Sequence, residues 1–129
     1  MTVSNIINIW LEKALQLPFI VNNDIIQNED EDGACLRYDP APAAERRYDD
    51  GSRLVTHNLT YYIRCESAAD ARNYAQDIIN TLDGQTIIDP ESNRRLEIEA
   101  QTLPQFINSD DKNYTTYAAA IECTYLEEK

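Results

Sequence analysis

The stretch RLVTHNLTYYIRCESAADARNYAQDIINTLDG, from Arg53 to Gly84, contains a long strand pattern that runs directly into a helix pattern. Apolar and polar residues alternate over 53–65, which is typical of a strand with one buried face. This alternation places on the buried face Val55, His57, Leu59, Tyr61, Ile63 and Cys65. Apolar residues then recur at helical spacing over 67–83, with Ser67 as a good N-cap and Gly84 as a stop. We therefore expect a strand and a helix joined by a very short turn.

The remaining chain adds a second helix and several strands to this unit. Apolar residues at helical spacing predict an N-terminal helix that starts near Ser4 and ends before Pro18. Alternating patterns predict further strands at 34–38, 86–88, 95–102 and 114–126, and 19–21 fits either a short strand or an extended link. Because strands joined by short turns pair antiparallel, we predict one α+β domain over 1–129. Its mainly antiparallel sheet has four or five strands, with the N-terminal helix and the helix at about 67–83 packed on it.

The least regular segment is 39–52, DPAPAAERRYDDGS, where two prolines and a DDGS turn signal break any period. A segment of this length without structure is unusual in a small domain and indicates a binding loop or a solvated one. We expect a mobile loop that becomes ordered when a neighbouring subunit or another partner binds. Arginine and tyrosine are enriched at protein interfaces. The candidate interface residues here and just beyond are Arg46, Arg47, Tyr48, Asp49, Asp50 and Arg53.

Charge restricts the classes of partner. The chain has 129 residues with 23 Asp and Glu against 11 Lys and Arg, for a net charge of -12. Such a field repels phosphates, so we expect no sequence-specific and no non-specific binding of nucleic acid. The acidity fits simple solubility. It also fits a surface past which DNA slides without sticking, or a mimic of DNA that binds a basic protein.

No pattern in the sequence predicts catalysis, a cofactor or a metal. The three cysteines lack CxxC spacing, and the single histidine, His57, lies in the strand pattern. We expect His57 to pack near the sheet with a backbone hydrogen bond. The run NEDEDG at 28–33 resembles the start of a calcium loop, but Asp39 stands where a bidentate Glu is needed. We therefore predict that the chain is not an enzyme.

No segment has the roughly 18 to 20 consecutive apolar residues that span a bilayer. The N-terminus also lacks a basic region followed by an apolar stretch. We expect no membrane partner and synthesis in the cytosol.

Three blocks of the chain resemble a known family. They are PFIVNND at 18–24, the block from Arg47 to Gly84, and TLPQFINSDDKNYTTYAAAIECTYLEE at 102–128. The aromatic strand followed by an arginine and a short serine-containing turn, here YYIRCES at 61–67, is a further point of likeness. In these features the chain resembles the minor capsid and tail-terminator (tail-completion) proteins of long-tailed bacteriophages and prophages.

The resemblance implies a structural protein of the virion with no chemistry. Such proteins assemble as a ring, which can be a hexamer, on the end of a completed tail tube and present the surface that docks to the head. The implied partners are further copies of the chain, the major tail tube protein and the head–tail connector protein. The implied location is the tail–head junction of a virion made in the bacterial host cytoplasm. The alternative that the residues leave open is a small acidic protein-binding regulator or DNA-mimic inhibitor.

Overall fold

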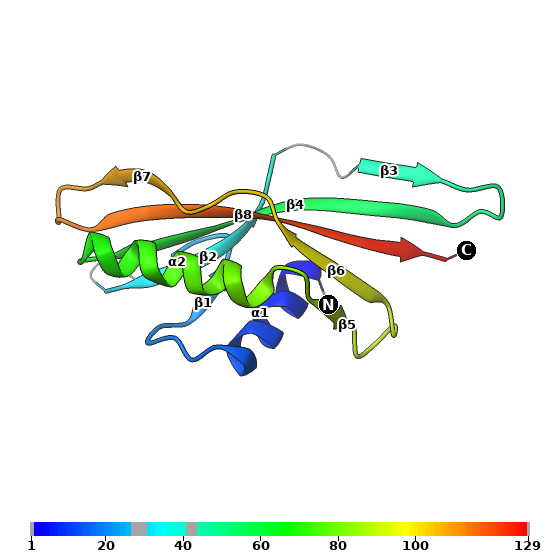
Figure 1. The fold of residues 1–129 in the computed structure, drawn as a ribbon, viewed down its shortest axis with the longest axis horizontal. Coiled ribbons are helices and arrows are strands. Elements are labelled where there is room, and N and C mark those ends of the chain that lie inside the picture. The colour runs from blue at the N-terminus through cyan, green and yellow to red at the C-terminus, as the bar shows by residue number, and fades with distance from the viewer. Residues whose placement is uncertain (1, 27–30, 41–43, 129) are drawn as a thin grey trace.

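Two long strands form the centre of the molecule (Figure 1). Strands β4 (Arg53–Cys65) and β8 (Thr115–Glu127) have 13 residues each and pair antiparallel along their full length, from Arg53 opposite Glu127 to Cys65 opposite Thr115. The computed structural model describes residues 2–26, 31–40 and 44–128. Because both strands carry alternating apolar residues, this ribbon supplies the buried floor on which the helices pack.

Six further strands extend the sheet on both sides of this ribbon. The main path is β1-β2-β4-β8-β6-β5, while β3 also pairs with β4 and β7 also pairs with β8. These strands are β1 (Val21–Asn23), β2 (Gly33–Tyr38), β3 (Ala44–Arg47), β5 (Thr86–Ile88), β6 (Arg95–Ala100) and β7 (Gln105–Ser109). All strand pairs are antiparallel except β1 with β2, which is parallel. The sheet is therefore mixed, with two short strands, β3 and β7, at opposite ends of the long ribbon.

Both helices lie on one side of the sheet (Figure 1). Helix α1 (Val3–Ala14) begins at Thr2, whose hydroxyl accepts the amide hydrogen bond of Asn5. Helix α2 (Ala68–Leu82) begins at Ser67, whose hydroxyl accepts from the amide of Asp70 as the sequence predicts. Gly84 follows α2 with φ of 79°, a conformation that glycine adopts without strain.

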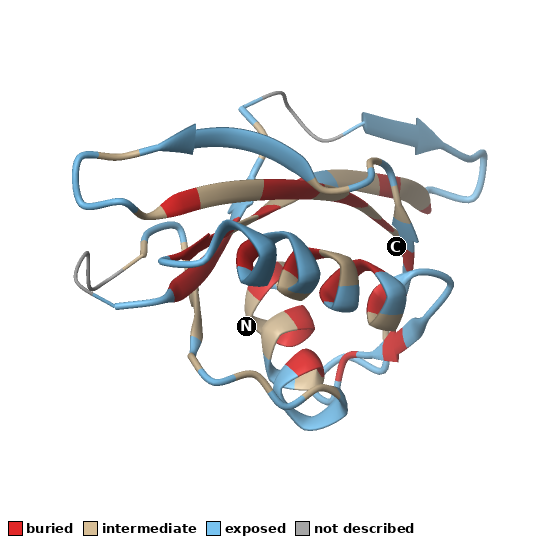
Figure 2. Ribbon diagram, turned by 60° about the vertical axis from the view of Figure 1, so that its left-hand side comes forward, coloured by how far each residue is buried: buried red, intermediate tan, exposed pale blue. Residues whose placement is uncertain are grey.

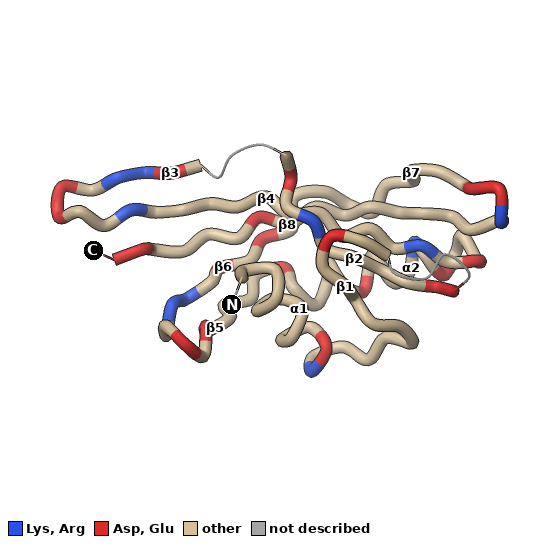
Figure 3. Tube along the Cα trace, turned by 180° about the vertical axis from the view of Figure 1, so that it is seen from behind, with Lys and Arg blue, Asp and Glu red and all other residues tan. Residues whose placement is uncertain are grey.

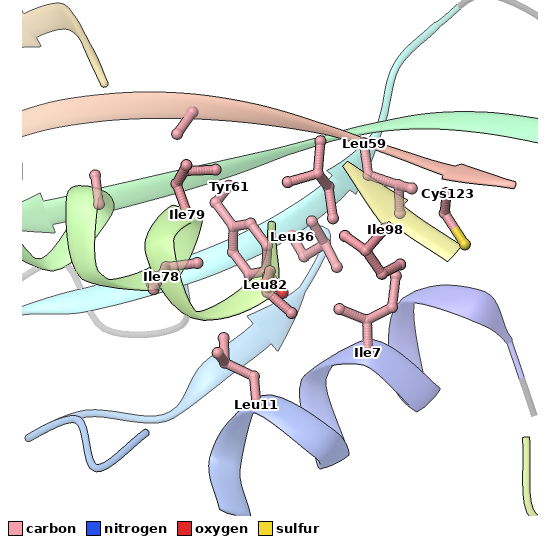
Figure 4. Packing of buried hydrophobic residues seen from close by; sticks show 14 of the residues in the cluster. Ile7, Leu11, Leu36, Leu59, Tyr61, Ile78, Ile79, Leu82, Ile98 and Cys123 are labelled. Atoms are coloured by element: carbon pink, nitrogen blue, oxygen red, sulfur yellow. The ribbon is translucent and has the colours of Figure 1, made fainter. Parts of the chain in front are cut away.

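The hydrophobic core fills the space between the helices and the sheet (Figures 2 and 4). Ile7 and Leu11 of α1 and Ile78 and Leu82 of α2 face the sheet and are fully or almost fully buried. From the sheet come Leu36, Leu59, Tyr61, Ile63, Leu96, Ile98 and Ile121, all at most 1 % exposed. Burial of these side chains is the main force that holds the helices on one face of the sheet.

The prediction of an α+β domain with two helices on the sheet is confirmed, but the strand number was wrong. The sheet has eight strands, and the prediction of four or five omitted β3 and β7. Every residue of β3 and of β7 is exposed, so neither strand has the alternation of apolar and polar residues that marks a half-buried strand. They form because β4 and β8 are long enough to offer them a pairing edge.

The expected irregular segment at 39–52 also differs in part. Residues 44–47 are strand β3, paired in register from Ala44 opposite Thr56 to Arg47 opposite Arg53. Residues 41–43 lie outside the described part of the chain. The residues predicted as either a short strand or an extended link become strand only at Val21, where β1 starts.

Candidate interaction surfaces

The clearest exposed feature is a two-stranded arm made by β3 and the first residues of β4. Here we use "the arm" for residues 44–56. It extends past the two helices at one end of the ribbon (Figure 1). Its turn is closed by hydrogen bonds from the amide of Tyr48 to the carbonyl of Ser52 (2.9 Å) and from the amide of Gly51 to the carbonyl of Tyr48 (3.1 Å). Gly51 has φ of 90°, so the turn depends on a glycine there.

The structure brings all six predicted interface residues together on this arm. Arg46 lies over the ring of Tyr48, with 5.8 Å between the guanidinium carbon and the ring centroid, a weak cation–π contact. Arg47 lies 3.6 Å from Glu45, and its side chain is 79 % exposed. Figure 3 shows basic residues along β3 and acidic residues at the turn that follows it. In the sequence this turn contains Asp49 and Asp50.

Two of the six residues also stabilise the arm itself. Arg53 contacts Glu45 and Glu127, each at 2.9 Å, so it links β3, β4 and β8. Asp50 accepts hydrogen bonds from the hydroxyl of Ser52 (2.6 Å) and from its amide (2.9 Å). These bonds lower the pKa of Asp50, so its charge persists at the turn. The arm therefore presents two arginines, one tyrosine and two carboxylates on a scaffold that Arg53 and Asp50 hold in place.

A second feature, which the sequence did not predict, is a groove at the other end of the ribbon. It has a volume of about 640 Å³ and lies on the sheet face that the helices leave uncovered. Ile25, Tyr62 and Ile107 supply apolar surface, and Cys35 and Thr116 complete this part of the lining. The charged lining residues are Arg37, Arg64, Asp110, Asp111 and Lys112. The available signals were the isolated apolar pair at 25–26 in a polar stretch and the apolar pair at 106–107.

Two charged residues of the groove, Arg64 and Asp110, are held by contact with each other. Arg64 donates to one carboxylate oxygen of Asp110, at 2.9 Å from Nε and 2.6 Å from an amino group. Its guanidinium also lies 4.1 Å from the ring centroid of Tyr114. The Arg64 hydrogen bond is the largest cause of a lowered pKa at Asp110. Arg37 lies over the ring of Tyr62 at 5.2 Å, so aromatic surface and positive charge are adjacent in the groove.

The uncovered face also carries a group of carboxylates, nearer the arm than the groove. Glu97 and Glu99 are exposed on β6, and Glu99 lies directly opposite Glu122 of β8. Like charges directly opposite each other destabilise a sheet. The carboxylates on this part of the face therefore repel one another, and the rest of the fold has to offset that repulsion. This part of the face is strongly acidic.

His57 is placed in an aromatic stack instead of a catalytic pair. Its Nε2 lies 3.1 Å from the hydroxyl of Tyr125, and its ring contacts the rings of Tyr38 and Tyr125, each at 5.6 Å. The expected backbone hydrogen bond is thus replaced by a tyrosine hydroxyl. Cys123 lies opposite His57 across the strand pair, but burial raises the pKa of its thiol to about 12. Burial therefore favours the neutral form of this thiol.

Among the residues that the structure describes, no group of three or more His, Cys, Asp and Glu side chains could hold a metal ion. Half of the calcium-like run at 28–33, residues 28–30, lies outside those residues. Asp32, at its end, accepts the amide hydrogen bond of Glu66 at 2.9 Å. In the described ranges, no helix has the length and apolar character to cross a membrane.

Comparison with protein-family models finds no match, and no curated protein matches the chain. The fold and its surfaces therefore define a class only in structural terms: a small, acidic α+β domain with a charged arm at one end of a long ribbon and a lined groove at the other.

Proposed function

We propose that the chain is a phage virion structural protein that caps the completed tail tube as a ring and forms the head–tail joining surface. The observation that carries the proposal is the arm, which extends past the helices, exposes every residue of β3 and holds all six predicted interface residues. The resemblance of three sequence blocks to tail-terminator proteins supports the same role. In this role the partners are further copies of the chain, the major tail tube protein and the head–tail connector protein.

A ring needs two different contact surfaces on each subunit, because heterologous contacts that close by rotation generate cyclic assemblies. The arm and the uncovered sheet face are different in composition and lie on different parts of the molecule. A small domain with these two surfaces has what a ring subunit requires.

The acidity of the chain also suits a position on the path of DNA. A wall of negative charge repels phosphates, so DNA would pass the joint without adhering to it. The carboxylates of Glu97, Glu99 and Glu122 on the uncovered face are candidates for such a wall.

The location of the protein tests this proposal. Purified particles from a producing phage or prophage are labelled with a gold-conjugated antibody against the chain and are imaged by electron microscopy. Label at the junction of head and tail is expected. Purified particles that lack the protein would contradict the proposal.

One observation favours a second function, an acidic regulator or DNA mimic. The opposed pair Glu99 and Glu122, with Glu97 beside it, gives closely spaced negative charge on one face. A mimic binds its basic partner through charge, so its affinity falls steeply as salt screens the contact. A ring contact that buries tyrosine and aliphatic surface beside a few charge pairs would depend on salt less steeply, because its apolar part is not screened.

A further inference from the structure

The turn of the arm and the groove lie at opposite ends of one rigid ribbon. Strand β4 begins at Arg53 beside the turn and reaches Arg64 in the groove. These residues are 11 positions apart, which corresponds to roughly 36 Å of strand. The turn therefore cannot reach the groove of its own chain, but it can reach that of a neighbour.

The turn of the arm carries side chains that could insert into a groove on another molecule. Tyr48 is 42 % exposed, although a tyrosine ring is largely apolar and gains free energy when it is buried. Arg46 lies over the Tyr48 ring on one side, and Asp49 and Asp50 follow it directly, so a half-exposed aromatic ring is followed by two carboxylates. The conformation is fixed by the hydrogen bonds of the turn, which reduces the entropy cost of docking.

The groove has the complementary chemistry. Its surface combines Ile25, Tyr62 and Ile107 with cationic side chains, although the chain as a whole is strongly acidic. Three of the 11 Lys and Arg residues of the chain line it, namely Arg37, Arg64 and Lys112. Asp110 and Asp111 also line the groove, and Asp110 is bound to Arg64. Arg37 and Lys112 are therefore the cations whose position beside the apolar surface suits a tyrosine followed by two carboxylates.

We propose that the turn of the arm, residues 48–51, docks in this groove on a second copy of the chain. The inference rests on the proposed function and names the contact that joins neighbouring subunits of the ring. Tyr48 of one copy packs against Ile107 and Tyr62 of the next, and Asp49 and Asp50 face Arg37 and Lys112. The contact is head-to-tail, so each copy keeps one free turn and one free groove until rotation closes the ring.

Charge selects this contact over symmetric ones. A turn-to-turn contact would place Asp49 and Asp50 of both copies together. A groove-to-groove contact would bring together two surfaces that each hold both cations and carboxylates, Asp110 and Asp111 among them. The turn-to-groove arrangement places the two carboxylates of one copy against cations of the other, and such complementarity of charge fixes which surfaces meet.

A mixing experiment tests the direction of the contact. Tyr48→Ala removes the tyrosine ring of the turn and leaves the groove intact, whereas Ile107→Arg obstructs the groove and leaves the turn intact. Native mass spectrometry of each variant alone is expected to show monomers. An equimolar mixture is expected to show dimers and nothing larger. The intact turn of the Ile107→Arg variant can dock in the intact groove of the Tyr48→Ala variant, and no further functional turn or groove then remains. Ile88→Arg, at a site on β5 that is 51 % exposed, is the control and should assemble as the unaltered chain does.

A photo-crosslinking residue at position 48 provides the second measurement, made in cells that produce the protein. We expect crosslinks between copies that end in the groove, at residues 105–112 or 35–37. Crosslinks that end elsewhere, or none between copies, would overturn the inference, as would assembly that survives Tyr48→Ala. The proposed function fails separately, if the protein is missing from particles while the turn-to-groove dimers still form.

Discussion

Arg53 of β4 and Glu127 of β8 lie opposite each other and form an ion pair of 2.9 Å at the base of the arm. A second nitrogen of Arg53 lies 2.9 Å from Glu45 of β3. One side chain thus joins the three strands that make up this end of the sheet. A residue selected from the sequence as an interface candidate is therefore also a support for the arm that carries the others.

This relationship predicts that Arg53→Gln loosens the arm and leaves the core unchanged. The substitution removes two ion pairs, so the amides of β3 should exchange hydrogen faster, while those of α2 keep their protection. Hydrogen–deuterium exchange read by mass spectrometry measures both. Arg47→Gln is the matched control, because Arg47 is 79 % exposed and has a 3.6 Å contact with the same Glu45. Equal effects of the two substitutions would contradict the role given to Arg53.

A buried hydrogen bond between sheet and helix gives a second prediction. The hydroxyl of Tyr61, which is fully buried, donates to the side-chain oxygen of Asn8 at 3.1 Å. Tyr61→Phe leaves that acceptor without its donor and should lower the free energy of unfolding by about 1–3 kcal/mol. Urea denaturation followed by circular dichroism measures the change. Tyr62→Phe, on the opposite face of the same strand, should have little effect, and a similar loss from both variants would be inconsistent with this account.

Protonation of Asp110 at low pH should reduce the stability of the fold at the groove. Arg64 lowers the pKa of this carboxyl in the folded state below its ordinary value of 3.8, so the unfolded state binds the proton more readily. The resulting stability is present above that value and is lost as pH falls through the lowered folded pKa. Asp110→Asn should therefore reduce Tm at about pH 7 and change it much less at about pH 2. Asp111→Asn is the neighbouring control. A Tm difference for Asp110→Asn that does not vary with pH would rule out this linkage.

His57 should add a separate pH dependence nearer neutrality. Burial lowers its pKa below the ordinary 6.5, so the neutral ring is favoured in the folded state. The unfolded state then binds more protons, and stability falls as pH drops from above 6.5 toward the folded pKa. His57→Gln should remove this part of the slope. Thermal unfolding across the range, with Tyr125→Phe as a variant that retains the titrating ring, measures it. Identical slopes with and without His57 would show that the ring does not contribute.

The sequence predicted those parts of the fold where burial imposes a period. The alternation over 53–65 and the helical spacing over 67–83 both reflect contact with one core, and α2 and β4 form as expected. Strands β3 and β7 have no buried face, so no period exists in AERR or QFINS to reveal them. Their formation depends on the pairing edges of β4 and β8, which is a property of the folded sheet.

The candidate surfaces also differ in whether a local stretch of sequence could indicate them. The six candidate residues of the arm are consecutive or nearly so and were chosen from the composition of the segment; that they form an interface stays a prediction. The groove combines residues from 25 to 116 that meet only in the folded chain, so no local motif could indicate it. The prediction of irregular structure was wrong at 44–47, because the pairing of this segment with β4 could not be inferred from two prolines and a turn signal. That the segment is mobile until a partner binds stays a prediction.

Electron microscopy of lysates from a producing phage or prophage that lacks this gene tests the central claim most directly. If the chain closes the tail and joins it to the head, the lysates should contain full heads separated from overlong or unjoined tails. Normal, joined particles in the absence of the gene would contradict the claim and favour the acidic regulator.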